Sequence, residues 1–174
     1  MTDEQTILTV KQAQAGDVKS LARLYERYAQ DMVWLAYSIC LDRDLAEDIA
    51  QETFAQVCLK LVHLKRPERF AGWLSMICRH LAIDTIRRRR IKTVNLAEAN
   101  ALPASATDPD NEGVGQAIAG LPRMYREIVV LHYFHSMTYE ELSQCLGISI
   151  HAVKGRLCRA RKKLRAILEL EPRT

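Results

Sequence analysis

The sequence predicts an all-α protein of two small helical domains joined by a flexible linker. Three observations predict this fold class. Apolar residues recur at three- and four-residue intervals over long segments, and no alternating run of β-branched residues marks a strand. A segment with few large apolar groups interrupts this pattern at residues 93–112. Near the C-terminus two helical patterns meet at a glycine-containing turn, which is typical of a helix-turn-helix.

Length and composition fit this prediction. The chain has 174 residues, 48% hydrophobic and 26% charged, which suits one medium core or two small ones and excludes a largely disordered chain. No apolar run approaches the ~20 residues of a bilayer helix, and the first residues lack the pattern of a secretory signal. We therefore expect a cytoplasmic protein.

The cysteines indicate neither disulfides nor a zinc knuckle. There are five of them, an odd number, and no two lie closer than 13 positions apart. Free cysteine is among the most buried residue types, so all five are expected to be buried thiols. They are Cys40, Cys58, Cys78, Cys145 and Cys158.

The first expected domain, residues 1–92, contains four helical patterns. A short helix over about 7–15 ends at Gly16, and longer helices follow over about 18–41, 45–64 and 70–90. Pro67 stops the third helix from continuing. The residues expected to face the core are Leu21, Leu24, Tyr28, Met32, Leu35, Ile39, Ile49, Thr53, Val57, Leu61, Phe70, Leu74, Ile77 and Leu81.

Residues 93–112 are expected to be a linker. They are rich in Ala, Asn, Asp and Pro, and they cannot bury enough apolar surface to offset the entropy of ordering. Such a segment would allow the two domains to hold two binding sites at a variable distance.

The second expected domain, residues 113–174, contains helical patterns over 114–119 and 123–134 and then a helix pair. Thr138 and Glu141 have the spacing of a capping box, Gly147 ends the short helix that they begin, and Ser149 is the expected N-cap of the last helix. The residues of that helix expected to face the core are Val153, Leu157, Ala160, Leu164 and Ile167.

The last helix has the charge of a DNA-binding helix. Positions 151–165 hold seven lysines and arginines and no acid. In a helix-turn-helix the start of the second helix reaches base edges and later basic residues meet phosphates. The candidates at the start are Ser149, His151, Ala152 and Lys154, and those that follow are Arg156, Arg159, Arg161 and Lys162. The alternatives are an amphipathic surface helix and an RNA-binding basic stripe.

The helix expected over 45–64 carries acids on its outer face beside an aromatic residue expected to be exposed. This surface suits docking of a basic partner, with charge guiding approach and a ring as anchor, but the sequence pattern alone favours a solvated helix face. No His, Ser or Cys lies at helical spacing from the acids, so we expect no catalytic site, no enzyme activity and no cofactor. The residues are Asp44, Glu47, Asp48, Gln51, Glu52 and Phe54.

The helix expected over 70–90 places Trp73, His80 and Arg87 on one face. An aromatic ring beside arginines is suited to stacking unpaired bases while neutralising backbone charge. The alternative is that Trp73 is a core residue and that Arg87–Arg90 are a solvated helix end.

Taken in order, these motifs resemble the extracytoplasmic-function (ECF) group of bacterial sigma factors, in the sigma-70 family. The resemblance rests on Asp44-Leu-Ala-Glu-Asp-Ile-Ala-Gln-Glu-Thr-Phe54, Phe70-Ala-Gly-Trp-Leu74, Arg79-His-Leu-Ala-Ile-Asp-Thr-Ile-Arg-Arg88, Leu121-Pro122, Tyr139-Glu-Glu-Leu142, Leu146-Gly-Ile-Ser149 and Val153-Lys-Gly-Arg-Leu-Cys-Arg-Ala-Arg161. It implies that residues 1–92 form a sigma region 2 domain and that residues 113–174 form a sigma region 4 domain.

The resemblance also implies roles and partners. The acidic helix would bind the β′ clamp of core RNA polymerase, the last helix would bind the minus-thirty-five promoter element, and the second domain would meet the β flap. An anti-sigma factor is implied, and no small-molecule substrate. The residues implied in recognising and melting the minus-ten element are Lys65, Arg66, Arg69, Trp73, Arg79, His80, Asp84, Arg87 and Arg88.

The chain departs from the common family pattern in three places, and two other functions stay open. His80 stands where Asn is common, Gly155 and Cys158 stand where Ser and His are frequent, and the loop over residues 64–69 is unlike the commonest pattern, so base preference is expected to differ. One alternative is a stand-alone helix-turn-helix regulator whose first domain senses or dimerises. The other is a thiol or metal sensor using Cys145, His151 and Cys158, although these three side chains leave a zinc tetrahedron incomplete.

Overall fold

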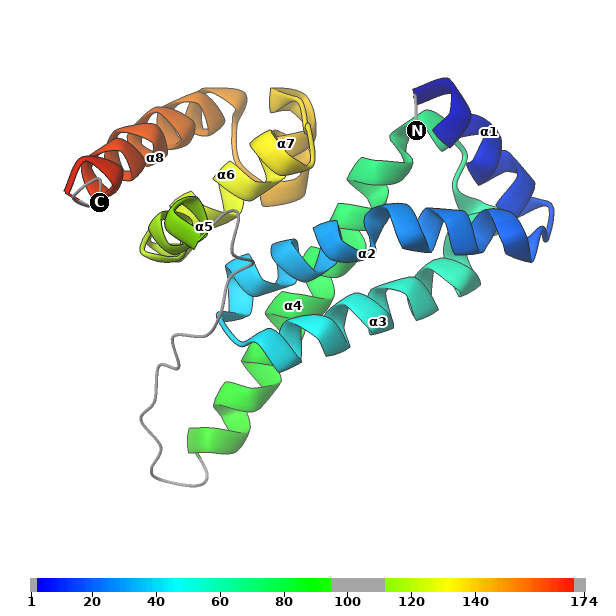
Figure 1. Ribbon diagram of the computed structural model, residues 1–174, viewed down its shortest axis with the longest axis horizontal. Helices are drawn as coiled ribbons and strands as arrows, with labels where there is room; N and C mark the ends of the chain where they lie inside the picture. The colour runs from blue at the N-terminus through cyan, green and yellow to red at the C-terminus, as the bar shows by residue number, and fades with distance from the viewer. Residues whose placement is uncertain (1–2, 95–111, 171–174) are drawn as a thin grey trace.

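The computed structural model describes residues 3–94 and 112–170, and every regular element within them is a helix (Figure 1). This confirms the predicted all-α fold. Most of the predicted linker, residues 95–111, lies outside the described residues. None of the described helices combines the length and apolar character that crossing a bilayer requires.

Four helices form the first module, residues 3–94. Their bounds are α1 Asp3–Gln14, α2 Val18–Cys40, α3 Arg43–Lys60 and α4 Phe70–Val94. Helices α2, α3 and α4 pack against one another, and α1 packs on α2 (Figure 1). The helix predicted to reach residue 64 ends at Lys60 and continues as the 3-10 turn Leu61–His63, and a second 3-10 turn, Pro67–Arg69, leads into α4.

Aspartates fix where two of these helices begin. The Asp17 carboxylate accepts hydrogen bonds from the backbone N–H groups of Lys19 and Ser20, at 3.1 and 3.2 Å. Asp42 accepts one from Leu45 at 3.0 Å. The first backbone N–H groups of a helix have no carbonyl partner within the helix, and each of these hydrogen bonds satisfies one such group.

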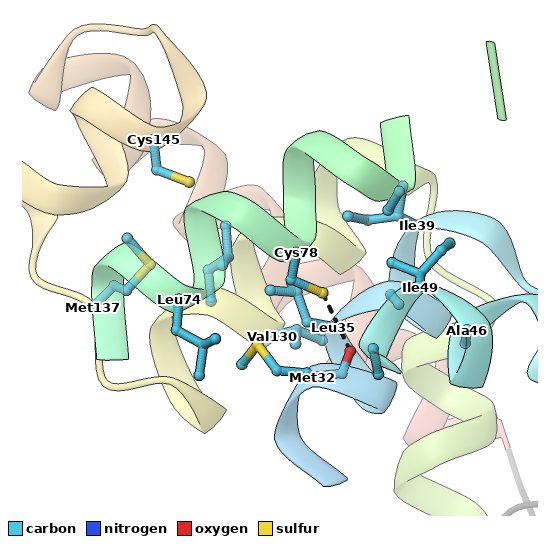
Figure 2. Close-up of a cluster of buried hydrophobic side chains, with 14 of the residues drawn as sticks. Met32, Leu35, Ile39, Ala46, Ile49, Leu74, Cys78, Val130, Met137 and Cys145 are labelled. Carbon is cyan, nitrogen blue, oxygen red and sulfur yellow. Dashed lines mark hydrogen bonds between the residues drawn. The ribbon is translucent and has the colours of Figure 1, made fainter. Parts of the chain in front are cut away.

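The core of the first module lies between α2, α3 and α4. Leu24, Leu35 and Leu74 are fully buried, and the Cys78 thiol donates a hydrogen bond of 3.4 Å to the Met32 carbonyl (Figure 2). Of the residues predicted to face this core, ten are buried. The other four, Leu21, Tyr28, Ile77 and Leu81, are half-buried against it.

The second module, residues 112–170, contains α5 Glu112–Ala119, α6 Arg123–Val129, the π-helical turn Val130–Phe134, α7 Tyr139–Leu146 and α8 Ile150–Leu170. The single helix predicted over 123–134 is therefore divided. The backbone N–H of His135 bonds the carbonyl of Val130, five residues earlier, at 3.3 Å. This wider turn ends the helix.

The two modules pack against each other. Helix α2 contacts α6 and the π-helical turn, and Val130 and Met137 of the second module share one apolar cluster with Met32 and Leu74 of the first (Figure 2). Sequence pattern did not predict this contact, because periodicity shows which face of a helix is apolar but not which partner covers it.

The prediction that all five cysteines are buried is wrong for two of them. Cys78 and Cys145 are buried and Cys40 is half-buried, but Cys58 on α3 and Cys158 on α8 are exposed. Burial raises the pKa of the Cys78 thiol to about 12 and that of Cys145 to about 11. The exposed thiols of Cys58 and Cys158 are therefore the ones that reagents can reach.

Candidate protein- and DNA-binding surfaces

Helix α3 turns an acidic face to solvent. The inner face of the helix packs on α2 and α4, which leaves one continuous polar stripe outside. The stripe, called here the acidic face, consists of the exposed residues Asp44, Glu47, Asp48, Gln51 and Glu52. Its carboxylates lie close enough in sequence to attract a basic surface together.

Phe54 does not belong to this surface as an exposed ring. It is only 6% exposed, and its ring meets Tyr25 of α2 edge to face at a centroid distance of 4.8 Å. The prediction of an exposed aromatic anchor at Phe54 is therefore wrong, because α3 packs on two helices and its buried stripe is wide enough to include this position. Tyr25, 46% exposed, is the aromatic residue beside the acidic face that sequence pattern did not identify.

The loop before α4 and the outer face of α4 carry most of the residues implied in minus-ten recognition. Arg66 pairs with Glu68 at 2.9 Å, and this hydrogen bond holds the pKa of the Glu68 carboxyl below its usual range. Trp73 is half-buried against Phe70, with ring centroids 6.1 Å apart. The alternative that Trp73 is a core residue therefore holds for part of its ring. The exposed members of the set are Lys65, Arg66, Arg69, His80, Asp84, Arg87 and Arg88.

Two arginines of this set pair with carboxylates of the second module. Arg79 Nε on α4 donates to Glu127 Oε1 on α6, and the two side chains are only 16% and 7% exposed. Arg69 Nη1 lies 3.1 Å from Glu141 Oε1 on α7. Sequence spacing could not indicate either pair, since the partners lie 48 and 72 positions apart.

Helices α7 and α8 form the predicted helix-turn-helix. Thr138 Oγ1 accepts from the Glu141 N–H at 3.2 Å while Glu141 Oε2 accepts from the Thr138 N–H at 2.9 Å, which is the predicted capping box. Gly147 has φ +64°, the left-handed conformation that ends α7 at low cost in glycine. The predicted cap of α8 is also present, since Ser149 Oγ accepts from the Ala152 N–H at 3.2 Å.

Helix α8 presents a long cationic face. Val153, Leu157 and Ala160 are buried against the rest of the module, which turns the basic side chains outward. The ammonium group of Lys154 lies 5.9 Å from the centroid of the Tyr139 ring. Ala152 and Arg156 are half-buried, and the exposed members of the predicted set are Ser149, His151, Lys154, Arg159, Arg161 and Lys162.

The three side chains of the sensor hypothesis are not placed as a metal site. Cys145 is buried in α7, whereas His151 and Cys158 are exposed on α8. Across residues 3–94 and 112–170, no group of three or more His, Cys, Asp or Glu side chains is placed to hold a metal ion.

Arg126 is a buried cation that sequence pattern did not identify. It donates to the carbonyl of Ser38 on α2, and its Nη1 donates to the carbonyls of Ala119 and Leu121 at 2.8 and 2.9 Å. Burial lowers the pKa of this guanidinium. An arginine in a helical pattern normally indicates solvent exposure, so only the tertiary packing assigns it this position.

His135 lies at the contact between the modules. Its Nδ1 is 3.2 Å from the Ser75 hydroxyl of α4, and this hydroxyl also donates to the Ala71 carbonyl at 2.9 Å. Because Ser75 has one proton to donate, the ring Nδ1 carries the hydrogen toward it. Burial lowers the pKa of His135 to about 4, and within the described residues its buried Nε2 has no hydrogen-bond partner.

We expect acid to loosen the packing around His135. Since its folded-state pKa of about 4 is below the usual value of 6.5, stability is full above pH 6.5 and falls as the pH drops toward 4. Between pH 7 and pH 5 the loss in the free energy of unfolding should be about 2 kcal/mol. Urea unfolding of the wild type and of His135→Gln at both pH values measures it. An equal pH dependence in the two proteins would contradict the assignment.

Both modules match known protein families. Residues 24–91 match the family described as sigma-70 region 2, and residues 112–164 match sigma-70, region 4. Over 96% of its length the chain is 33% identical to "ECF RNA polymerase sigma factor SigE" of Mycolicibacterium smegmatis, and the match covers 69% of that protein. The chain belongs to the ECF RNA polymerase sigma factors. It is also 28% identical to SigW of Bacillus subtilis, over 90% of the chain and 92% of SigW.

Relatives differ in length from this sigma factor. It is 32% identical to "Probable RNA polymerase sigma factor RfaY" of Xanthomonas campestris pv. campestris over 88% of its own length but spans only 41% of that protein. Among solved structures it resembles CnrH in complex with the cytosolic domain of CnrY, with a TM-score of 0.67, 25% identity, and coverage of 95% of this chain and 98% of CnrH. RpoE in complex with the anti-sigma factor NepR from Bartonella quintana has a TM-score of 0.72 at 24% identity, covering 88% and 99% of the two chains, and this similarity supports the fold.

Proposed function

We propose that this sigma factor binds core RNA polymerase and directs transcription initiation at specific promoters. The observation that carries the proposal is the pairing of two oppositely charged surfaces on one chain, the acidic face of α3 and the cationic face of α8. A protein that joins a polymerase to DNA needs one surface for each. The surfaces also occur in the order of the two family regions that the chain matches.

The acidic face is the proposed docking surface for the polymerase β′ clamp. Asp44, Glu47, Asp48, Gln51 and Glu52 contribute to it. Their charges would guide approach to a basic partner, and the adjoining Tyr25 ring provides apolar contact area. Phe54 supports this surface from beneath, because its ring holds Tyr25 in place.

The loop before α4 and the outer face of α4 form the proposed minus-ten surface. A base that leaves the stack costs a few kcal/mol, and stacking and phosphate contacts offset that cost. Lys65, Arg87 and Arg88 are exposed and available for phosphates, whereas the exposed Arg66 is paired with Glu68. His80 and Asp84 are exposed on α4. The half-buried Trp73 lies in the first turn of the same helix, α4.

The helix-turn-helix is the proposed minus-thirty-five site. Its second helix, α8, would enter the major groove with His151 and Lys154 near base edges, followed by Arg159, Arg161 and Lys162 on phosphates. Ser149, Ala152 and Arg156 complete the predicted minus-thirty-five set.

Other features of the proposal come from the family and its relatives. The structural relatives CnrH and RpoE were solved in complex with the cytosolic domain of CnrY and with the anti-sigma factor NepR, respectively, which supports an anti-sigma partner for this chain. The family resemblance further suggests that the second module meets the β flap of the polymerase. We also propose that the protein acts in the cytoplasm and has no enzyme activity of its own.

Run-off transcription with purified core polymerase on genomic fragments tests the proposal. Specific transcripts that depend on the added protein are expected, and their start sites would define the promoter motif. A stand-alone regulator would instead bind duplex DNA specifically without polymerase and give no transcripts. That second result would refute the proposed function.

Removing two cations of α8 should weaken duplex binding and reduce its salt dependence. Each phosphate-binding side chain that is removed lowers the slope of log affinity against log salt by about one, so Arg159→Ala with Lys162→Ala should lower it by about two. Fluorescence anisotropy on a promoter duplex from about 50 to about 300 mM salt measures this slope. Lys11→Ala on α1 is the control, and an unchanged slope in the double variant would exclude α8 as the duplex-binding helix.

A further inference from the structure

One side chain of α1 holds the loop before α4, which spans residues 61–69. Gln14 is the last residue of α1, and its Nε2 donates hydrogen bonds to the carbonyls of Leu61 and Leu64, at 2.9 and 2.8 Å. Both neighbours are acceptors, so only the amide nitrogen can face them, and both of its hydrogens are used. The two carbonyls lie 47 and 50 positions along the chain from Gln14, so the tertiary structure alone brings the three groups together.

Helix α1 is held in place on the first module. Val10 on this helix is fully buried and belongs to the apolar cluster. In the turn that leads to α2, the Ser20 hydroxyl donates to the Asp17 carboxylate at 2.6 Å. The helix lies beside both 3-10 turns of the loop (Figure 1). The Gln14 amide therefore extends from a helix whose own position is fixed by packing.

The two carbonyls lie where the loop leaves helical structure. Leu61 begins a 3-10 turn, and its carbonyl also accepts from the Leu64 N–H at 3.0 Å. Leu64 has an extended backbone, with φ −72° and ψ 103°, and its carbonyl accepts from Gln14. The next two residues, Lys65 and Arg66, are exposed members of the proposed minus-ten surface. Gln14 therefore fixes the backbone directly before them.

A loop that recognises a melted strand binds more tightly when it is ordered beforehand. Ordering side chains and loops at an interface costs free energy, and a site that is already rigid avoids that cost. Within the loop Arg66 pairs with Glu68, but an exposed ion pair of this kind stabilises a conformation only weakly. The Gln14 amide ties the same segment to a different helix.

We propose that Gln14 is a positioning residue for promoter recognition, whose amide holds the loop before α4 in the conformation that reads the melted minus-ten strand. This inference rests on the proposed function, because it assumes that the loop meets DNA. Gln14 acts through the carbonyls of Leu61 and Leu64 and not by touching DNA. The match to sigma-70 region 2 covers residues 24–91, so this residue lies outside the region that the family description covers.

The first test measures the order of the loop without polymerase or DNA. Gln14→Leu removes both donors, keeps a side chain of similar size and leaves the net charge unchanged. Hydrogen exchange read by mass spectrometry on the full-length protein follows the amides of residues 61–69, among them the Leu64 N–H that bonds Leu61. We expect exchange in this segment to become about tenfold faster, which corresponds to the loss of one to two net hydrogen bonds, while exchange in α2 and α4 stays unchanged.

Gln12→Leu is the matched control for this test. Gln12 is exposed on the same helix, and its Oε1 lies 3.0 Å from the Ser20 hydroxyl of α2. Its side chain therefore meets α2 and not the loop. Loop exchange in the control should equal that of the wild type. Equal loop exchange in Gln14→Leu and the wild type would overturn the proposal.

The second test measures promoter discrimination with core polymerase. Run-off templates carry a mapped promoter, or the same promoter with one base changed in its minus-ten or its minus-thirty-five element. A wrong base pair lowers binding by roughly fivefold to a hundredfold. In Gln14→Leu we expect discrimination within the minus-ten element to fall about fivefold, while discrimination within the minus-thirty-five element keeps its wild-type value. The Gln12→Leu protein should keep both.

A purely structural role and a failure of the proposed function give different results. If Gln14 only stabilises the fold, its loss lowers transcription from every template in proportion and leaves both discrimination ratios unchanged, which would overturn the positioning role. If wild-type protein gives no core-dependent transcript from any fragment, the proposed function is refuted. Hydrogen exchange would then still decide whether Gln14 orders the loop.

Discussion

Replacing Asp48 and Glu52 by lysine should abolish binding of this sigma factor to core polymerase while its fold stays intact. Both side chains are exposed on the acidic face of α3, so the change removes attraction to a basic partner and adds repulsion at the same place. Like-charge juxtaposition at an interface costs several kcal/mol, which corresponds to a loss of affinity of roughly a hundredfold or more.

Co-migration with core polymerase in gel filtration and a fluorescence titration measure this loss. Glu26→Lys with Glu140→Lys changes net charge equally on other exposed surfaces and should keep core binding. The helix-turn-helix of the Asp48 and Glu52 variant should still bind duplex DNA. Core binding equal to that of the control would exclude the acidic face as the docking surface.

The burial of Phe54 separates docking from folding. Phe54→Ala should cost about 3 to 5 kcal/mol of stability, because it leaves a cavity beneath the acidic face. Loss of core binding in that variant would therefore reflect unfolding as well as docking. The two exposed charges are the cleaner test of the surface.

Replacing Arg126 by methionine should destabilise the protein by about 3 kcal/mol, since buried carbonyls lose their donor at about 1 to 3 kcal/mol each. Three carbonyls, those of Ser38, Ala119 and Leu121, depend on this one side chain. Methionine fills much of the same volume but cannot donate a hydrogen bond. Part of the loss is offset because no charge remains to be buried.

Urea unfolding monitored by circular dichroism measures the effect at Arg126. Arg123→Met is the matched control, because Arg123 is exposed on the same helix and should change stability by no more than about 0.5 kcal/mol. A loss below about 1 kcal/mol at Arg126 would show that water or other donors satisfy the carbonyls.

Local physical rules explain why much of the fold was predictable from sequence. The capping box at Thr138, the left-handed Gly147 and the Ser149 cap involve partners within five residues, so the sequence contains both members of each interaction. The same is true of the apolar stripe of α8, whose members recur at helical spacing. The family resemblance, carried by short motifs, was confirmed by comparison with known sigma factors.

The sequence-based predictions of burial were wrong where the exposure of a side chain depends on how neighbouring helices pack. Phe54 lies at the edge of the stripe of α3, and its burial depends on packing against the neighbouring helices, including its contact with Tyr25 of α2. Cys58 and Cys158 have apolar character but lie on faces that no helix covers.

The amino-acid sequence by itself determined the helices, their caps, the helix-turn-helix and the charge of each outer face, because these follow from interactions over a few residues. Only the tertiary structure decided that Arg126 is buried, that His135 meets Ser75, and that Glu127 and Glu141 cover two arginines of the other module. These contacts join residues up to 88 positions apart. Local periodicity has no information on such distant pairings, which depend on how complete helices pack.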